Sequence, residues 1–252
     1  MTELYWLTDT QIERLRPFFP KSRGKPRADD RRVLSGIILI QRNGLMWKHA
    51  PREYGPPKTL YNRWKRWSRM GVFARIMTEL AAQAQETGIV MIDATHAKAH
   101  RTASSLGRAK GGRGRLIGRT KGGLNSKLHV VADAKGRPIR MFLSAGQTSD
   151  YIGARALLSS IPQAAVLLGN RGYDADWFRN ALIEMGISPC IPSRRGRKVP
   201  IPHDADLYRQ RHKIENMFAR LKDWRRIATR YDRCPILFLS ACALAATGIY
   251  WL

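Results

Sequence analysis

The sequence predicts an α/β protein in which a mixed sheet flanked by helices follows an all-helical N-terminal region. Up to residue 86, apolar residues recur at helical spacing between capping and turn residues. From Ile89 onward, short apolar runs come first and then alternate with helical segments, an order typical of a mixed sheet with helices on its faces. We therefore expect a helical domain over residues 1–86 and an α/β domain over residues 87–252.

The N-terminal region should contain four helices, over residues 9–19, 29–43, 58–70 and 72–86. Thr8 and Gln11 form a capping box for the first, and Gly44 ends the second. Trp64 and Trp67, three residues apart on the third helix, should face the core. The same helix carries the cations Lys58, Arg63, Lys65, Arg66 and Arg69. The order helix, helix, turn, basic helix indicates a helix-turn-helix, and the alternative is a three-helix bundle with a basic surface.

Five strands are predicted in the second region, over residues 89–92, 127–132, 139–143, 165–168 and 188–191. Helices over residues 149–158 and 175–185 separate the later strands. The uncharged stretch over residues 235–252 is interpreted as a buried core helix, because it is at the short limit for a membrane span and rich in small residues.

The charge balance is strongly basic, with 45 Lys and Arg against 19 Asp and Glu, a formal net charge of +26 and a pI near 11.0. Such an excess requires a polyanionic partner. Because the cations are interleaved with Trp, Tyr and Gly, nucleic acid is favoured over a membrane surface. Two basic, glycine-rich loops, residues 101–121 and 194–198, lack the spacing of a phosphate-binding loop and are interpreted as mobile DNA-contacting loops.

The cysteines and the first residues indicate the cellular compartment of the protein. Cys190, Cys234 and Cys242 are odd in number and have no paired spacing, which indicates reduced thiols in a cytosol. The sequence does not open with a basic and then apolar leader, so we expect no export and a cytoplasmic protein associated with the nucleoid.

A spacing of Tyr-x2-Arg-x3-Glu-x6-Lys lies near the end of the chain, as Tyr208, Arg211, Glu215 and Lys222. On one continuous helix these offsets place all four side chains in a stripe about 60° wide. The adjoining face is apolar and should dock on a core; it consists of Ile214, Met217, Phe218 and Leu221. The stripe can bind a polyanion, with a metal ion at the carboxylate and the cations on neighbouring phosphates. The alternative is a solvated, charged helix face.

Asp93 follows the first apolar run and should terminate a buried strand. A carboxylate is costly there unless it pairs with or coordinates a cation. In open sheets, ligand sites collect at strand ends, and carboxylates from a strand and a helix together can hold cations for phosphate chemistry. Asp93 and Glu215 are therefore candidate metal ligands.

Several separated motifs occur in an order that resembles the bacterial insertion-sequence transposases of the DDE type, which have a ribonuclease-H-like catalytic core. They are Leu7-Thr8-Asp9, residues 29–34, Tyr61-Asn62-Arg63-Trp64, residues 92–96, residues 118–123, Gly146-Gln147, Arg171-Gly172-Tyr173-Asp174 and the four-residue stripe. The stripe is the signature of the insertion-sequence-four and insertion-sequence-five groups, and the short N-terminal region is similar to the latter. The resemblance covers nearly the whole chain.

This resemblance implies a metal-dependent nuclease and strand transferase that frees a 3′-hydroxyl at a transposon end and joins it to target DNA. Asp93, the residue at position 170 and Glu215 would be the catalytic residues and would hold two Mg²⁺ or Mn²⁺ ions. The implied partners are double-stranded terminal inverted repeats and target DNA, bound by a homodimer. The DNA-contacting residues would be Tyr208, Arg211, Lys222, Lys58, Arg63, Lys65, Arg66, Arg119 and Lys121. Arg211 could also orient Glu215.

The sequence departs from the family at the second carboxylate, where it has Asn170. A unit charge about 4 Å away is worth roughly 4 kcal/mol at an effective dielectric of 20, so we expect at least about a thousandfold loss of activity. Asp174 and Asp176 lie too far along the chain to replace it without remodelling the strand end. A deliberate inactivating substitution and a decayed natural copy both fit.

Three neighbouring residues are not assigned to catalysis. His96 and His129 are interpreted as groups that bind the backbone or core, and Asp150 as a helix N-terminal residue with no metal contact. Two other classes of function remain. One is a non-catalytic DNA-binding repressor or architectural protein derived from a transposase; the other is an RNA-binding protein, which the lack of a stacking platform disfavours.

Overall fold

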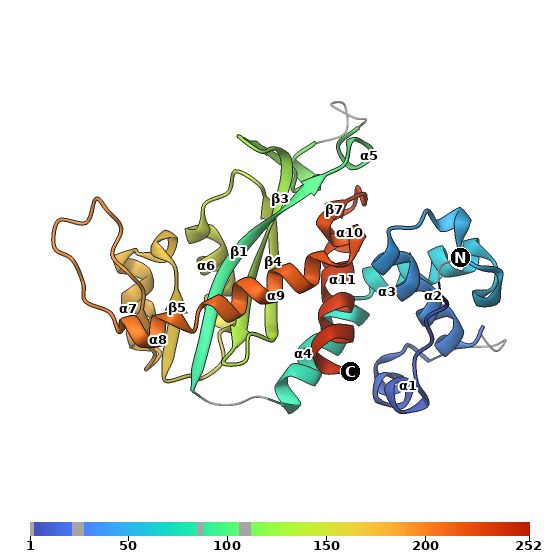
Figure 1. Cartoon of the computed structure of the whole chain (residues 1–252), viewed down its shortest axis with the longest axis horizontal. Helices are drawn as coiled ribbons and strands as arrows, with labels where there is room; N and C mark the ends of the chain where they lie inside the picture. Colours follow the sequence, from blue (N-terminus) through green and yellow to red (C-terminus); the bar gives the residue numbers. More distant parts are fainter. Residues whose placement is uncertain (1–2, 22–27, 85–87, 106–111) are drawn as a thin grey trace.

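The structure is a computed structural model that describes residues 3–21, 28–84, 88–105 and 112–252. A central sheet separates one group of helices from the N-terminal helices, which lie at the opposite end of the molecule (Figure 1). Part of the predicted basic loop at residues 101–121, and the end of the predicted helix over residues 72–86, lie outside the described residues.

The sheet is mixed, with the strand order and directions of a ribonuclease-H-like fold. The central strand β1 is antiparallel to β3, which is antiparallel to β4, while β5 and β6 continue the other side in parallel. The bounds of these strands are β1 Ile89–Ala99, β3 Gly123–Asp133, β4 Pro138–Ala145, β5 Val166–Gly169 and β6 Ser188–Cys190. All five predicted strands are present, which confirms the predicted α/β class.

The prediction of a five-stranded sheet is wrong in number, because two short strands make it seven-stranded. β2, Gly118–Thr120, pairs with the start of β3, and β7, Thr229–Arg230, pairs with the end of β1. Neither has an apolar run that a sequence pattern could detect. The buried Arg230 explains why β7 lies there, since its guanidinium donates to the carbonyl oxygens of Arg115 at 2.8 Å and Leu116 at 3.3 Å.

β1 is much longer than predicted, and Asp93 is not its last residue. Antiparallel pairing with β3 continues as far as Lys98 opposite Asn125, across residues whose polarity hid the strand. The parallel partner β5, however, ends at Gly169 opposite Ile92. Asp93 therefore lies inside a strand, at the point where the parallel half of the sheet stops.

Helices cover the sheet and join it to the N-terminal region. Their bounds are α5 Arg101–Ser104, α6 Asp150–Leu157, α7 Asp176–Glu184, α8 Ala205–Arg209, α9 His212–Lys222, α10 Arg225–Ala228 and α11 Pro235–Ala246. α9 crosses the sheet over β1, and α11 lies between the sheet and the N-terminal helices (Figure 1). α11 is almost wholly buried, as predicted, and continues into a π-helical turn over Thr247–Trp251. Among the described residues, no helix is long and apolar enough to cross a membrane.

The N-terminal helices are α1 Asp9–Leu15, α2 Asp30–Asn43, α3 Pro57–Arg69 and α4 Val72–Gln83. The Thr8–Gln11 capping box forms, and Gly44 ends α2 with a left-handed φ of 72°. Trp64 and Trp67 are buried, as predicted. α1 is shorter than expected because its last turn tightens into a 3₁₀ helix at Arg16–Phe18, within which Pro17 has no backbone N–H to donate.

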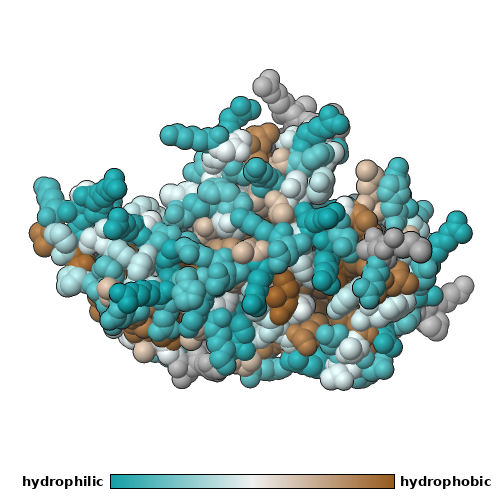
Figure 2. Space-filling view, viewed as in Figure 1, coloured by the Kyte–Doolittle hydropathy of each residue, from teal (hydrophilic) through white to brown (hydrophobic). Residues whose placement is uncertain are grey.

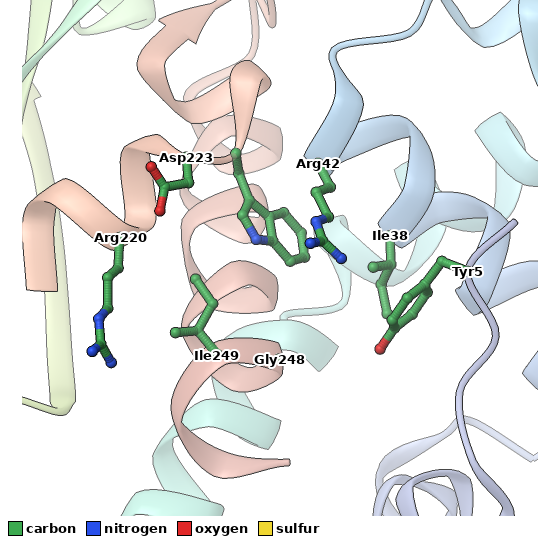
Figure 3. Close-up of a pocket in the computed structure, with 8 residues that line it drawn as sticks. Tyr5, Ile38, Arg42, Arg220, Asp223, Gly248 and Ile249 are labelled. Atoms are coloured by element: carbon green, nitrogen blue, oxygen red, sulfur yellow. The ribbon is translucent and has the colours of Figure 1, made fainter. Parts of the chain in front are cut away.

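The N-terminal helices and the rest of the chain share one hydrophobic core. α11 packs on α2, α3 and α4, and the Arg226 guanidinium donates to the carbonyl oxygen of Leu45 at 2.8 Å. A cavity of about 370 Å³ lies in the seam, with Tyr5 and Arg42 on the N-terminal side and Arg220 and Asp223 on the other (Figure 3). The division into two domains at residue 86 stays a prediction.

Candidate active site

Asp93 and Asn170 meet because their strands are neighbours in the sheet. Ile92 pairs with Gly169, so the next residues of β1 and β5 lie side by side. The Asn170 amide Nδ2 donates to Asp93 Oδ1 at 2.8 Å, and its Oδ1 accepts the backbone N–H of Gly172 at 2.6 Å. The side chain that replaces the expected carboxylate therefore caps the 3₁₀ turn Arg171–Tyr173 and donates a hydrogen bond to one oxygen of Asp93.

Arg211 connects Asp93 to Glu215. Its Nη1 donates to Asp93 Oδ2 at 2.7 Å, and its Nη2 donates to Glu215 Oε1. The carboxylates of the central strand and of the crossing helix thus face the same guanidinium. Asp93 is nearly buried, whereas the Glu215 side chain is 55% exposed, so the site opens to solvent on the side of α9.

The surroundings of Asp93 favour a bound cation. Burial raises the pKa of Asp93, the backbone N–H of Ala94 and the Arg211 guanidinium oppose that shift, and the charges of Asp150 and Glu215 add to it. An opposite charge close to a desolvated carboxylate favours its ionised form. Arg211 is that partner in this structure.

The four-residue stripe is not on one helix, which corrects the prediction. Tyr208 belongs to α8, Arg211 precedes α9, and Glu215 and Lys222 lie in α9. The cause is a tightened turn, in which the N–H groups of Arg211 and Ile214 each bond to the carbonyl three residues earlier. Arg211 keeps right-handed helical angles, so the chain hardly changes direction and the stripe still faces β1.

The other two members of the stripe contact Arg211 and β1. The Tyr208 ring lies 5.6 Å from the Arg211 guanidinium carbon. Lys222 Nζ donates to Thr95 Oγ1 at 2.7 Å, two residues along β1 from Asp93, and burial lowers the pKa of Lys222. The apolar face of α9 is buried, as predicted.

Asp150 is the residue whose neighbourhood the sequence did not reveal. It occupies the first turn of α6, as predicted, and its Oδ1 pairs with Lys127 Nζ at 2.7 Å. Its other oxygen lies close to Gly172, as does Asn170 Oδ1: a β-carbon added to Gly172 would be 2.7 Å from Asp150 Oδ2 and 2.8 Å from Asn170 Oδ1. No local pattern could show this, because three separate segments meet there.

The two histidines left outside the catalytic set bind within the sheet region. His129 Nε2 lies 2.8 Å from Ser144 Oγ, and His96 Nε2 lies 3.0 Å from the carbonyl oxygen of Gly146. Burial, with Lys127 close by, lowers the pKa of His129 to about 4. His129 is therefore a neutral, buried group at neutral pH.

Asp174 and Asp176 do not reach Asn170 but anchor the basic loop after β6. Asp174 is fully buried and accepts from Arg179 Nε, Arg197 Nε and the backbone N–H of Arg194, each at 2.8 Å. Although burial opposes ionisation, these donors lower the pKa of Asp174 to about 2. Asp176 pairs with Arg197 Nη1 at 2.7 Å.

The remaining predicted DNA-contacting residues lie in different settings. Lys58 and Arg66 on α3 are exposed, Lys65 is half-buried, and Arg119 and Lys121 are exposed where β2 turns into β3. Arg63 instead pairs with Asp30, and its guanidinium carbon lies 5.1 Å from the Trp67 ring centre. Lys65 lines a cavity of about 690 Å³ between α3 and residues 231–237. Hydrophilic side chains cover most of the visible face around these elements (Figure 2).

In the described ranges, no three His, Cys, Asp or Glu side chains gather closely enough to hold a metal ion. The oxygen donors nevertheless suit a hard divalent cation, since Asp93, Asn170 and Glu215 offer carboxylate and amide oxygens. What now holds the carboxylates together is the Arg211 guanidinium.

A mixed sheet with a buried aspartate on its central strand, faced by an acidic and basic helix, defines a protein with a ribonuclease-H-like fold and a candidate phosphate-chemistry site. Residues 84–234 match the transposase DDE domain family, and residues 7–77 match the putative transposases of the IS4/5 family. The chain belongs to the transposase DDE domain family. Family and fold together support a DNA transposase.

Individual relatives agree with this family. Over 134 residues the chain is 34% identical to a putative transposase for insertion sequence element IS6501 of Brucella ovis, covering 50% of this chain and 98% of that protein. Over 137 residues it is 31% identical to a putative transposase for element IS402 of Burkholderia cepacia, covering 50% and 63%. The piggyBac transposase in a synaptic complex with hairpin DNA shares the fold, with a TM-score of 0.50, 10% identity and coverage of 96% and 71%.

Proposed function

We propose that this protein binds insertion-sequence ends and catalyses metal-dependent cleavage and transfer of DNA strands at Asp93, Asn170 and Glu215, and that Asn170 impairs this activity. The observation that carries the proposal is the Arg211 bridge. It brings a carboxylate from the sheet centre and one from the crossing helix to the same group, which is the arrangement needed to gather cations beside a phosphate.

The family implies dependence on a divalent metal ion, and Asp93, Asn170 and Glu215 would hold Mg²⁺ or Mn²⁺, two ions in the active form. When bound, such ions polarise a phosphate and lower the pKa of a bound water. The protein's own contribution is orientation. Asp93 is fixed by the Ala94 N–H at 2.8 Å and by strand pairing, so its oxygens are held in place before DNA arrives.

Arg211 has a second role in this proposal. Its guanidinium now lies between two carboxylates, a position that a cation would compete for. Once a cation neutralises Asp93 and Glu215, Arg211 is available to a DNA phosphate, which it can bind through two N–H groups. Tyr208 in α8 and Lys222 in α9, on either side of it along the chain, would hold the neighbouring phosphates and the terminal bases.

Asn170 impairs the site in two ways. Its amide removes one negative charge, and its Nδ2 donates to the Asp93 oxygen that a cation would otherwise use. The hydrogen bond thus satisfies Asp93 without a metal ion. A carboxylate at position 170 could not do so, because two ionised carboxylates at this separation repel each other unless a cation or a shared proton lies between them.

The basic surface supports double-stranded DNA as the partner. The net charge is +26, and exposed cations lie on α3 and on the β2–β3 turn. We propose that Lys58, Lys65, Arg66, Arg119 and Lys121 bind phosphates of the transposon ends and of target DNA, and that two copies act together. Arg63 can join them only if its ion pair with Asp30 opens.

The test is a cleavage assay on DNA that carries the element's ends, with Mg²⁺ or Mn²⁺. The unaltered protein should cleave at least about a thousandfold more slowly than Asn170→Asp. Glu215→Gln in the Asn170→Asp background should abolish cleavage, and Glu184→Gln, on the remote helix α7, should not. Absence of cleavage by the Asn170→Asp protein on its own ends contradicts the proposal.

The second candidate function is a non-catalytic DNA-binding repressor or architectural protein. The observation that favours it is that Asn170 and Arg211 donate hydrogen bonds to both oxygens of Asp93, so the carboxylate has partners without any metal ion. Tight binding to the ends by both the unaltered and the Asn170→Asp proteins, with no cleavage by either, would favour it.

A further inference from the structure

The cavity of about 690 Å³ lies between α3 and the segment that runs from the end of β7 to the start of α11 (Figure 1). It is separate from the candidate active site, because Asp93, Asn170 and Glu215 do not line it. His100 lies on its wall and follows directly after β1, which places the cavity roughly 23 Å along that strand from Asp93. The lining combines aromatic rings, cations and one buried carboxylate.

Aromatic rings line the cavity on both sides. Trp47 and Tyr61 lie on the N-terminal side, with ring centres 5.4 Å apart. His100 and Tyr231 lie on the other side, with ring centres 4.7 Å apart. The Arg226 guanidinium carbon lies 5.7 Å from the ring centre of Trp47 and 5.7 Å from that of Tyr231. Tyr61 and Tyr231 are 36% and 38% exposed, so both rings can contact a flat ligand.

Two cations, Lys65 and Arg69, lie one turn apart on α3 and also line the cavity. Neither side chain makes a hydrogen bond or an ion pair with any residue that the structure describes. Across the cavity, Arg233 Nε donates to the carbonyl oxygen of Thr102 at 3.0 Å. Because a phosphate binds strongly to cations placed in this way, a ligand that carries one is favoured.

Asp232 adds a hydrogen-bond acceptor to this lining. Its side chain is 8% exposed, and its Oδ1 lies 4.0 Å from Arg226 Nη1. Its Oδ2 has no hydrogen-bond partner within the described ranges. An apolar ligand would leave this oxygen without a donor, and an acidic ring would be repelled by it. A flat ring that carries N–H groups fits the lining, and nucleobases are such rings.

We propose that the cavity binds one unpaired nucleobase of a DNA strand, with the base against Tyr231 and Tyr61 and its phosphate on Lys65 and Arg69. The choice of DNA rests on the proposed function, whereas the recognition of a base with its phosphate rests on the cavity itself. Stacking on an aromatic ring tolerates any sequence, because every base has a π-face. In a duplex the bases are stacked on one another, so the cavity selects strands that are locally unpaired.

A strand bound at the candidate active site can reach the cavity along β1. Lys222 lies on this path, since its Nζ donates to Thr95 Oγ1 between Asp93 and the end of the strand. The cavity thus supplies a second anchor, which holds the DNA strand roughly 23 Å from Asp93.

The experiment compares two short DNA strands of equal length, one of mixed sequence and one in which stable abasic analogues replace all the bases. Because the strands have the same charge, the ratio of their affinities measures what the bases contribute. Measured by fluorescence anisotropy with the full chain, the mixed strand should bind at least about tenfold more tightly than the abasic strand. Tyr231→Ala should remove most of this preference, and Tyr231→Phe should keep it.

Two further variants separate the roles of the rings and the cations. Arg69→Ala should weaken the binding of both strands by similar factors, because it removes a phosphate contact and no ring. Trp6→Ala is the matched control: Trp6 is 41% exposed but does not line the cavity, so the preference for bases should not change. Thermal melts show whether each variant is folded.

A fluorescent base reports contact directly. A 2-aminopurine placed in the mixed strand should lose fluorescence on binding to the unaltered protein, because stacking quenches it, and should lose less with Tyr231→Ala. A merely structural role of Tyr231 would not produce this difference in a folded variant.

The outcomes distinguish this inference from the proposed function. Equal binding of the two strands by the unaltered protein, or an undiminished preference in folded Tyr231→Ala, overturns the inference. Tighter, Tyr231-dependent binding of an RNA strand of the same sequence would reject DNA as the ligand. Cleavage by Asn170→Asp is measured on duplex ends and can succeed when the inference fails. Conversely, a preference for bases that depends on Tyr231 stands even if Asn170→Asp cleaves no DNA.

Discussion

The side-chain amide of Asn170 donates a hydrogen bond to Asp93 across the junction of two parallel strands, at 2.8 Å. This contact replaces a repulsion between two carboxylates with an attraction. A site that in an active enzyme would depend on metal ions is thereby stabilised by protein groups alone. Because of this hydrogen bond, the residue at position 170 should affect the stability of the fold as well as the activity of the protein.

Asn170→Asp should therefore destabilise the metal-free protein. Two carboxylates at hydrogen-bonding distance in a mostly buried position repel each other, and we expect a loss of about 1–4 kcal/mol in the free energy of unfolding. Added Mn²⁺ should restore much of this loss. Thermal melts with EDTA and with Mn²⁺ measure both effects, and equal melting temperatures for the two proteins in EDTA would contradict the expectation.

Arg211→Met should destabilise the protein more than Glu215→Gln. The first change leaves Asp93 desolvated without its cation, which typically costs about 3–5 kcal/mol, whereas Glu215 is half exposed and its carboxylate can be hydrated. Chemical unfolding at pH 7 gives both values. A smaller loss for Arg211→Met than for Glu215→Gln would show that Asp93 does not depend on this guanidinium.

His129 should make the fold less stable as the pH falls from about 6.5 to about 4. Its pKa is lowered from 6.5 to about 4 in the folded protein, so the unfolded chain binds a proton first and is favoured in this window. The full effect is roughly 3 kcal/mol, and none of it accrues above pH 7. His129→Gln should flatten the dependence of the unfolding free energy on pH between 7 and 4, and an unchanged slope would argue against a buried neutral histidine.

Asp174 should contribute to unfolding at lower pH. Its pKa is depressed to about 2 from 3.8, so its stabilisation is complete above pH 4 and is lost as the pH falls towards 2. Asp174→Asn should cost about 3 kcal/mol at pH 7, because it leaves the buried Arg179 without a carboxylate. Acid titrations followed by circular dichroism should show a smaller loss of stability below pH 4 in this variant.

The cations of α3 should separate into two groups. Lys58→Ala and Arg66→Ala should each weaken DNA binding about equally on all sequences and lower the salt dependence of the affinity, since both are exposed. Arg63→Ala should mainly lower the melting temperature, because Arg63 pairs with Asp30. Fluorescence anisotropy at several salt concentrations, together with melts, tests this; a large salt-slope change for Arg63→Ala alone would reverse the assignment.

The sequence determined the features that depend on near neighbours. The capping box at Thr8, the left-handed Gly44 and the buried Trp64 and Trp67 follow from local spacing, and they are found as predicted. All five strands with a continuous apolar run were also recognisable. The assignment of Asp93, Asn170 and Glu215 as catalytic residues rests on the family motifs. It stays a prediction until the site is tested.

Only the tertiary structure decided which distant groups meet. The sheet order places Asn170 beside Asp93, the tightened turn directs Arg211 at both carboxylates, and the absence of a side chain at Gly172 lets both Asp150 and Asn170 approach that residue. The length of β1 was likewise settled by pairing with β3 rather than by its own composition. The physical reason is that hydrophobic spacing specifies which face of a segment is buried, whereas contacts between polar side chains depend on strand register and helix packing, which residues far apart in the sequence fix together.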